Sequence, residues 1–163
     1  MTRHANTSRP LENYQIPVQI KLAAAWTSFM FLYLYVDHLV LYKPGVVDGI
    51  LAGMMWQFEV SQTLVTVAFA SLAIPAFMIL LSMTLPARVS RATNLVVASL
   101  NIPYAIFNAV GESWTYFFGL SIGLEGLVLA FILRSAWTWP RTPSPSIAVP
   151  AATADLPGKQ VHA

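Results

Sequence analysis

Four long apolar runs divide the chain, and short segments between them hold most of its polar groups. The runs cover about residues 21–42, 61–85, 93–110 and 115–135. Each is near the roughly 20 residues that a helix needs to cross the hydrocarbon of a bilayer. Helix is the expected conformation, because lipid offers no partners to open backbone groups. The pattern predicts an all-α fold, a four-helix transmembrane bundle over residues 16–139.

The segment Lys43–Val60, between the first two runs, is longer than the other connections and not plainly polar. Its apolar residues recur at helical spacing, which is typical of an amphipathic helix lying at the membrane surface. A short re-entrant helix or turn and an ordinary ordered loop are the alternatives. The apolar positions are Val47, Ile50, Leu51, Met54, Met55 and Phe58.

The two ends have a different character. Residues 1–15 are polar, and residues 140–163 are rich in Pro, Ala and Ser. The second composition cannot bury a core, so we expect a disordered tail. The first apolar run is too long for the core of a signal peptide, and we expect it to remain as the first span.

The basic residues predict an orientation. Of nine Lys and Arg, only Lys43 lies on the side of the first and third connections between the runs. Cytoplasmic loops carry the excess of Lys and Arg. We therefore expect a multi-pass protein of the plasma (inner) membrane with both termini cytoplasmic. The cations on that side are Arg3, Arg9, Lys21, Arg88 and Arg91 in the connection Pro86–Ala92, Arg134, Arg141 and Lys159.

Composition agrees with a membrane protein. The chain is 56% hydrophobic and 10% charged, whereas soluble domains average about 25% charged residues. The absence of Cys excludes disulfides, thiolate metal sites and Cys nucleophiles. No dense basic run suits nucleic acid, and no phosphate loop, nucleophile elbow or zinc motif occurs. We predict no catalytic residue, no metal ligand and no cofactor.

Glu125 is the main candidate for a functional group. It lies in the middle of the otherwise uncharged run Phe117–Leu133, where a carboxylate costs about 2.5–3.5 kcal/mol on insertion scales. No Lys or Arg reaches that depth. We expect Glu125 to be inside the bundle, largely protonated, and hydrogen-bonded to Asn101 or Tyr104.

Each run carries its polar residues on one helical face, at 100° per residue. Four such faces turned inward predict a polar pocket that opens outward, with Glu125 near its floor. The faces are Trp26, Met30, Tyr33 and Asp37; Glu59, Gln62, Thr63 and Thr66; Asn101, Asn108 and Glu112; and Trp114, Phe118, Ser121 and Glu125. The candidate ligand- or proton-binding residues are Glu125, Asn101, Asp37, Glu112, Asn108, Tyr104, Tyr33 and Glu59.

Two further patterns concern Pro and Trp. Pro75 and Pro103 lie inside the second and third runs and predict kinks. Such breaks line the site in some transporters and are simply tolerated in ordinary bundles.

The tryptophans fall mostly near the ends of runs, as in an aromatic belt. They are Trp26, Trp56, Trp114, Trp137 and Trp139.

Several stretches also resemble a known family. They are IPVQIKLAAAWTSFMFLYLYVDHLVLYKPG (16–45), LAGMMWQFEVSQ (51–62), IPAFMILLSMTLPARVSR (74–91) and GESWTYFFGLSIGLEGLVL (111–129). They are similar to a family of small, uncharacterised bacterial four-span membrane proteins with a general DoxX-like look. The resemblance implies the fold but no activity, and points to Asp37, Pro44, Gly45, Glu112 and Glu125 as motif positions.

Three functions remain open from the sequence. The first is a transport-related or sensing protein whose pocket holds a proton, a cation or a small amine-bearing or lipophilic ligand. The second is an accessory subunit or homo-oligomer assembled through its helices, with Gly123 and Gly126 at the contact. The third is a quinone-linked oxidoreductase with Tyr33, Tyr104 and Trp26 around the quinone. A divalent cation held by Asp37, Glu59 and Glu112 is a further alternative for the site.

Overall fold

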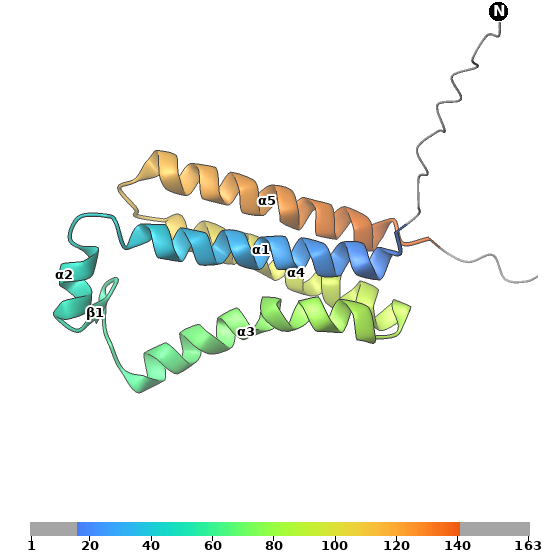
Figure 1. Cartoon of the computed structure of the whole chain (residues 1–163), viewed down its shortest axis with the longest axis horizontal. Coiled ribbons are helices and arrows are strands. Elements are labelled where there is room, and N and C mark those ends of the chain that lie inside the picture. Colours follow the sequence, from blue (N-terminus) through green and yellow to red (C-terminus); the bar gives the residue numbers. More distant parts are fainter. Residues whose placement is uncertain (1–15, 141–163) are drawn as a thin grey trace, which may run out of the picture.

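Four long helices form a bundle in the computed structural model, which describes residues 16–140 (Figure 1). Each has 23 residues, which gives a length of about 35 Å at ~1.5 Å per residue. The predicted bundle with a short helix between its first two members is confirmed. The elements are α1 (Val18–Val40), α2 (Val46–Leu51), β1 (Met54–Met55), β2 (Phe58–Glu59), α3 (Gln62–Thr84), α4 (Ala87–Ala109) and α5 (Thr115–Trp137).

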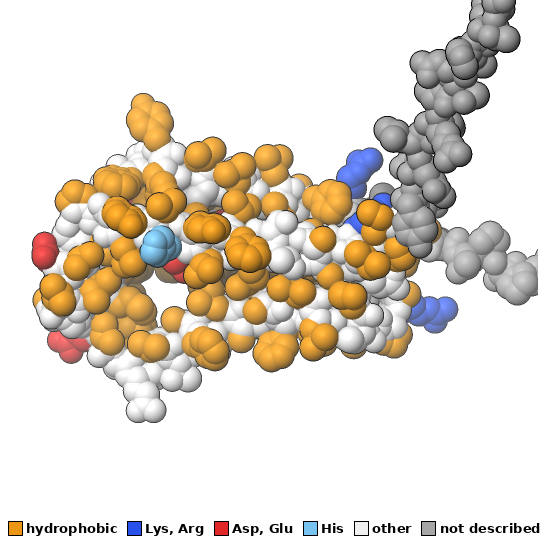
Figure 2. Space-filling model, viewed as in Figure 1, with side chains coloured by type: hydrophobic (Ala, Val, Ile, Leu, Met, Phe, Trp, Pro, Cys, Tyr) orange, Lys and Arg blue, Asp and Glu red, His pale blue; other side chains and the backbone are white. Residues whose placement is uncertain are grey.

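The outside of the bundle is largely apolar. Figure 2 shows hydrophobic side chains along its whole visible length, with Lys and Arg at one end and Asp and Glu at the other. Two helices, α3 and α5, are long and apolar enough to cross a membrane. Large side chains that stay exposed include Phe31, Leu34, Phe69, Phe77, Leu100 and Leu127.

Helix α1 holds the bundle together. It packs against both α3 and α5, and α5 packs in turn against α4, whereas α3 and α4 touch over a smaller area. The fully buried core lies toward the end of the bundle where α1 begins and α5 ends. Its largest members are Trp26, Phe29, Leu22, Met78, Leu129 and Ile132.

Helix α3 leaves the bundle at its N-terminal half (Figure 1). Pro75 lies inside this helix, where its ring removes a hydrogen bond and crowds the carbonyl one turn back, at Ser71. The expectation that the polar face of this segment turns inward was wrong. Its residues are exposed, and the Thr66 hydroxyl donates to its own helix, 2.7 Å from the Gln62 carbonyl oxygen. The exposed face comprises Glu59, Gln62, Thr63 and Thr66.

The segment between α1 and α3 is helical only at its start. The expected apolar helix would run on to Phe58, but α2 ends at Leu51. Gly53 follows with φ +79°, and its N–H donates to the Ile50 carbonyl. A left-handed glycine of this kind ends a helix. A two-stranded antiparallel hairpin follows, with Met55 opposite Phe58.

The loop expected at Pro86–Ala92 is mostly helix. Helix α4 begins at Ala87, directly after Pro86 at φ −55°, an angle that suits the start of a helix. Arg88 and Arg91 therefore lie in its first turns, and the Arg91 guanidinium lies 6.0 Å from the centre of the Trp137 ring on α5. The predictions for residues 1–15 and for the tail after Pro140 fall outside the described residues.

Candidate functional site

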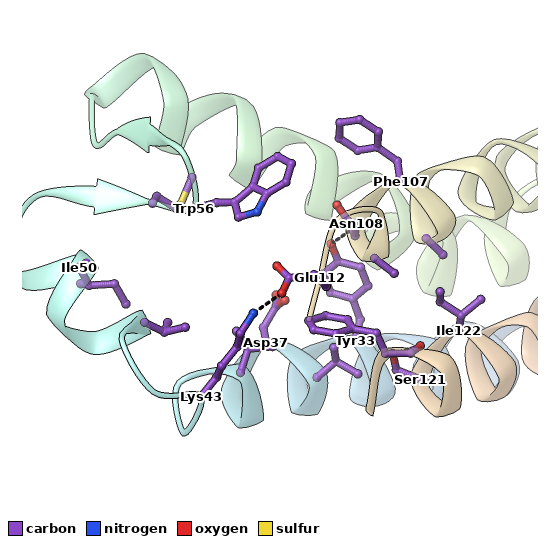
Figure 3. A pocket seen from close by; sticks show the side chains of 18 of the residues that line it. Tyr33, Asp37, Lys43, Ile50, Trp56, Phe107, Asn108, Glu112, Ser121 and Ile122 are labelled. Carbon is purple, nitrogen blue, oxygen red and sulfur yellow. Dashed lines mark hydrogen bonds and ion pairs between the residues drawn. The ribbon is translucent and has the colours of Figure 1, made fainter. Parts of the chain in front are cut away.

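A cavity of about 630 Å³ lies at the end of the bundle that carries α2 and the hairpin (Figure 3). Residues of α1, α4 and α5 form one part of its wall, and α2 with the hairpin forms the other. Its size is that of ordinary ligand pockets, which span roughly 300–1,000 Å³. The divergence of α3 leaves this end of the bundle less tightly packed than the core.

Five of the eight residues predicted to form a site line this cavity, and three do not. Asn101 and Tyr104 lie on α4 away from the wall, and Glu59 is exposed on β2. The three carboxylates proposed for a divalent cation are therefore not gathered at one place. The residues that do line the cavity are Glu125, Asp37, Glu112, Asn108 and Tyr33.

Glu125 is buried, with only 5% of its surface exposed. It shares the inner face of α5 with Phe118 and Ser121, as the helical spacing predicted, and all three line the cavity. Trp114, expected on the same face, precedes the helix, is exposed and does not line the cavity.

The expected hydrogen bond of Glu125 to Asn101 or Tyr104 is not formed. The Asn101 amide donates to the Val97 carbonyl of its own helix at 2.9 Å, and the Tyr104 hydroxyl bonds with those of Tyr33 and Ser71. Across residues 16–140, Glu125 takes part in no ion pair or hydrogen bond through its side chain.

Lys43 and Glu112, which both line the cavity, form an ion pair (Figure 3). Lys43 follows α1, and Glu112 lies in the turn between α4 and α5, so the pair ties two connections that are distant in sequence. Both side chains are largely shielded, at 19% and 14% exposed. Sequence reasoning used Lys43 only as a topology signal. With Glu112 neutralised, Asp37 and Glu125 are the cavity carboxylates that have no basic partner in the described region.

A chain of hydrogen bonds leads from the cavity wall toward α3. The Asn108 amide donates to the Tyr33 hydroxyl at 3.0 Å, and the Tyr33 hydroxyl donates to that of Tyr104 at 3.4 Å. The Ser71 hydroxyl lies 3.2 Å from the Tyr104 hydroxyl. These contacts link α4, α1 and α3, so Tyr104 supports Tyr33 from behind the wall. Sequence reasoning missed Ser71, although Pro75 one turn later was the available signal.

Aromatic rings form another part of the wall. Trp56, at the tip of the hairpin, packs edge-on to Phe107 of α4 with ring centres 6.3 Å apart. Its backbone has φ +57°, a conformation that bulky residues rarely adopt and that is often found at functional sites. Phe118 was predicted on the inner face of α5 by its helical spacing, whereas Phe107 was not predicted, since it shares no face with the polar residues of its run.

A second polar cluster is buried in the core, away from the cavity. Trp26 was expected in an aromatic belt or beside a quinone, but it is fully buried, and its Nε1 donates to Asn94 Oδ1 at 2.7 Å. Ser82 also donates to Asn94 Oδ1, at 3.1 Å. The Asn94 amide donates to the Ser90 carbonyl at 2.7 Å. The cluster joins α1, α3 and α4, and its polar atoms are paired with one another.

No three His, Asp or Glu side chains within the described residues come together as a metal site would require. Comparison of the chain with protein-family models, with curated proteins and with solved structures finds no match. The chemistry of the site is therefore interpreted from its own geometry.

Proposed function

We propose that the chain is a multi-pass protein of the plasma (inner) membrane with four spans and cytoplasmic termini. Helices α1 and α4 are as long as α3 and α5, and the exterior of the bundle is apolar. The described cations other than Lys43 lie where α1 and α4 begin and α5 ends. That end would be cytoplasmic by the excess of Lys and Arg, and the cavity would open on the other side.

Within that frame, we propose that the protein binds a small ligand in the cavity, for transport or for sensing. The observation that carries this proposal is Glu125, a buried carboxyl group that lines the cavity with no partner in the described region. The carboxyl oxygens reach the cavity and are not sealed in the core, and a polar group held there without a protein partner costs free energy unless water or a ligand supplies one. A glutamine at this position would fill the same space without an ionisable group. A ligand that pairs with the Glu125 carboxyl group would offset this free-energy cost.

Native mass spectrometry of the purified chain in detergent tests the proposal. Wild type should retain a small molecule that is lost when the cavity is filled by Gly49→Phe. Gly49 lines the cavity, and a β-carbon added there meets no atom within 4 Å, so the larger side chain can extend into the open space and the variant should fold. Ala70→Phe is the control, because Ala70 is exposed on α3 and is not part of the cavity wall. Identical bound masses in all three proteins would contradict ligand binding in this cavity.

Assembly through α5 is a second candidate function. Gly119, Gly123 and Gly126 follow one another at helical spacing on a single face, and a β-carbon added at any of them meets no atom within 4 Å. Ala130 continues this face and is exposed. Small residues spaced in this way let membrane helices approach closely. The face has no partner within the described bundle, which favours contact with a second chain.

A further inference from the structure

We infer that the ligand of the cavity is an organic cation with an aromatic or otherwise apolar body. This inference rests on the proposed binding function and specifies the chemistry of what is bound. It follows from the balance of charge in the cavity, from the nature of its walls, and from its size.

With its carboxyl groups ionised, the cavity carries a net negative charge after internal pairing. Asp37, Glu112 and Glu125 line it, with Lys43 as the one ammonium among the lining residues. Lys43 is engaged by Glu112. Asp37 on α1 and Glu125 on α5 remain, and these two helices pack directly against each other. A positive charge between them would interact with both, and the interaction is strong where water is scarce.

The walls suit a cation that also carries apolar surface. Tyr33, Trp56, Phe107 and Phe118 contribute aromatic rings, and the faces of such rings attract cations. Most of the remaining wall is aliphatic. Ile50, Met54, Met55 and Ile122 are among these residues.

The size of the cavity argues for a molecule rather than a bare ion. A space of about 630 Å³ is far larger than a single metal ion, and the acidic and histidine side chains that the structure describes do not gather in threes. A ligand that places a cationic group near Asp37 and Glu125 and an apolar body against Trp56 and Phe107 would use both features. The competing outcome is that no cation binds and that protons neutralise the carboxyl groups of Asp37 and Glu125.

The probes are tetraphenylphosphonium and tetraphenylborate, which have nearly the same shape and opposite charge. Each is titrated into the purified full chain in a non-ionic detergent, with empty micelles as the blank, and binding is measured by equilibrium dialysis. We expect the phosphonium to bind at about one site per chain and the borate to bind at least about tenfold more weakly. Equal affinity for the two ions would overturn the inference.

Charge variants locate the effect. Asp37→Asn and Glu125→Gln should each weaken phosphonium binding by about tenfold, whereas Asp48→Asn should change it by less than about twofold. Asp48 is exposed on α2, close to the cavity in sequence but not part of its wall. Lys43→Gln should strengthen binding, because it frees the Glu112 carboxylate. An Asp48 effect as large as those of Asp37 and Glu125 would show that surface charge, and not the cavity, selects the ion.

Gly49→Phe separates the failure of this inference from the failure of the proposed function. If wild type bound the two probe ions with equal affinity and Gly49→Phe bound neither, the cavity would bind ligands without selecting cations. Absence of phosphonium binding to wild type would also overturn the inference. The proposed function would then stand or fall on the molecule retained by wild type in native mass spectrometry.

Discussion

Trp26 of α1 and Asn94 of α4 are both fully buried, and the indole Nε1 donates a 2.7 Å hydrogen bond to the amide oxygen. The same oxygen accepts from Ser82 of α3. One side chain thus joins three helices at the end of the bundle opposite the cavity. Because buried polar groups that are fully paired specify a unique packing, this cluster anchors the bundle while its other end is free to form a site.

Removal of the Asn94 amide should destabilise the fold. Asn94→Ala leaves the Trp26 N–H without an acceptor, and an unpaired buried group costs about 1–3 kcal/mol. Asn101→Ala is the matched control on the same helix, since its amide bonds only to its own helix at Val97. Thermal unfolding in detergent measures both. Equal losses in the two variants would contradict a special role for Asn94.

The Lys43–Glu112 pair should show energetic coupling. Lys43→Gln and Glu112→Gln each leave a shielded charge without its partner. The destabilisations of the two single variants should therefore add up to more than the destabilisation of the double variant. A double-mutant cycle on unfolding free energies should give a coupling of about 1 kcal/mol. Additive effects would show that the pair adds nothing to the stability of this end of the bundle.

The proposed orientation can be tested by cysteine labelling, since the chain contains no Cys. Asp48→Cys and Ser113→Cys lie on the cavity side, and both positions are exposed. They should react with a membrane-impermeant maleimide in intact cells. Ala87→Cys and Thr138→Cys, at exposed positions of the opposite end, should react only after the membrane is opened. The reverse pattern would invert the topology and turn the cavity toward the cytoplasm.

The open glycine face of α5 predicts an effect on assembly. Gly123→Leu adds a large side chain at a position that is exposed and where an added β-carbon meets no atom within 4 Å. It should therefore leave the monomer folded and disperse any complex formed through this face. Native mass spectrometry gives the oligomeric state. Gly49→Leu is the control, because it adds the same side chain at an open glycine on α2. An unchanged complex in Gly123→Leu would exclude this face as the contact.

The apolar runs and helical periodicity were enough to predict the four long helices and the inward face of Glu125 on α5. They succeeded because run length and spacing along one helix are local properties. Boundaries marked by Gly or Pro were less well predicted. Gly53 ends α2 early, and Pro86 starts α4 early, because these residues act through backbone angles that an apolar pattern does not record.

The amino-acid order alone thus determined the class of fold, the number of long helices, and which residues of each share a face. Only the tertiary structure decided which faces meet: Lys43 with Glu112, Trp26 with Asn94, and the polar start of α3 with nothing in the described bundle. The physical reason is that periodicity sets a side chain's direction about its own helix axis. Packing between helices far apart in sequence, and the divergence of α3, decide what that side chain encounters.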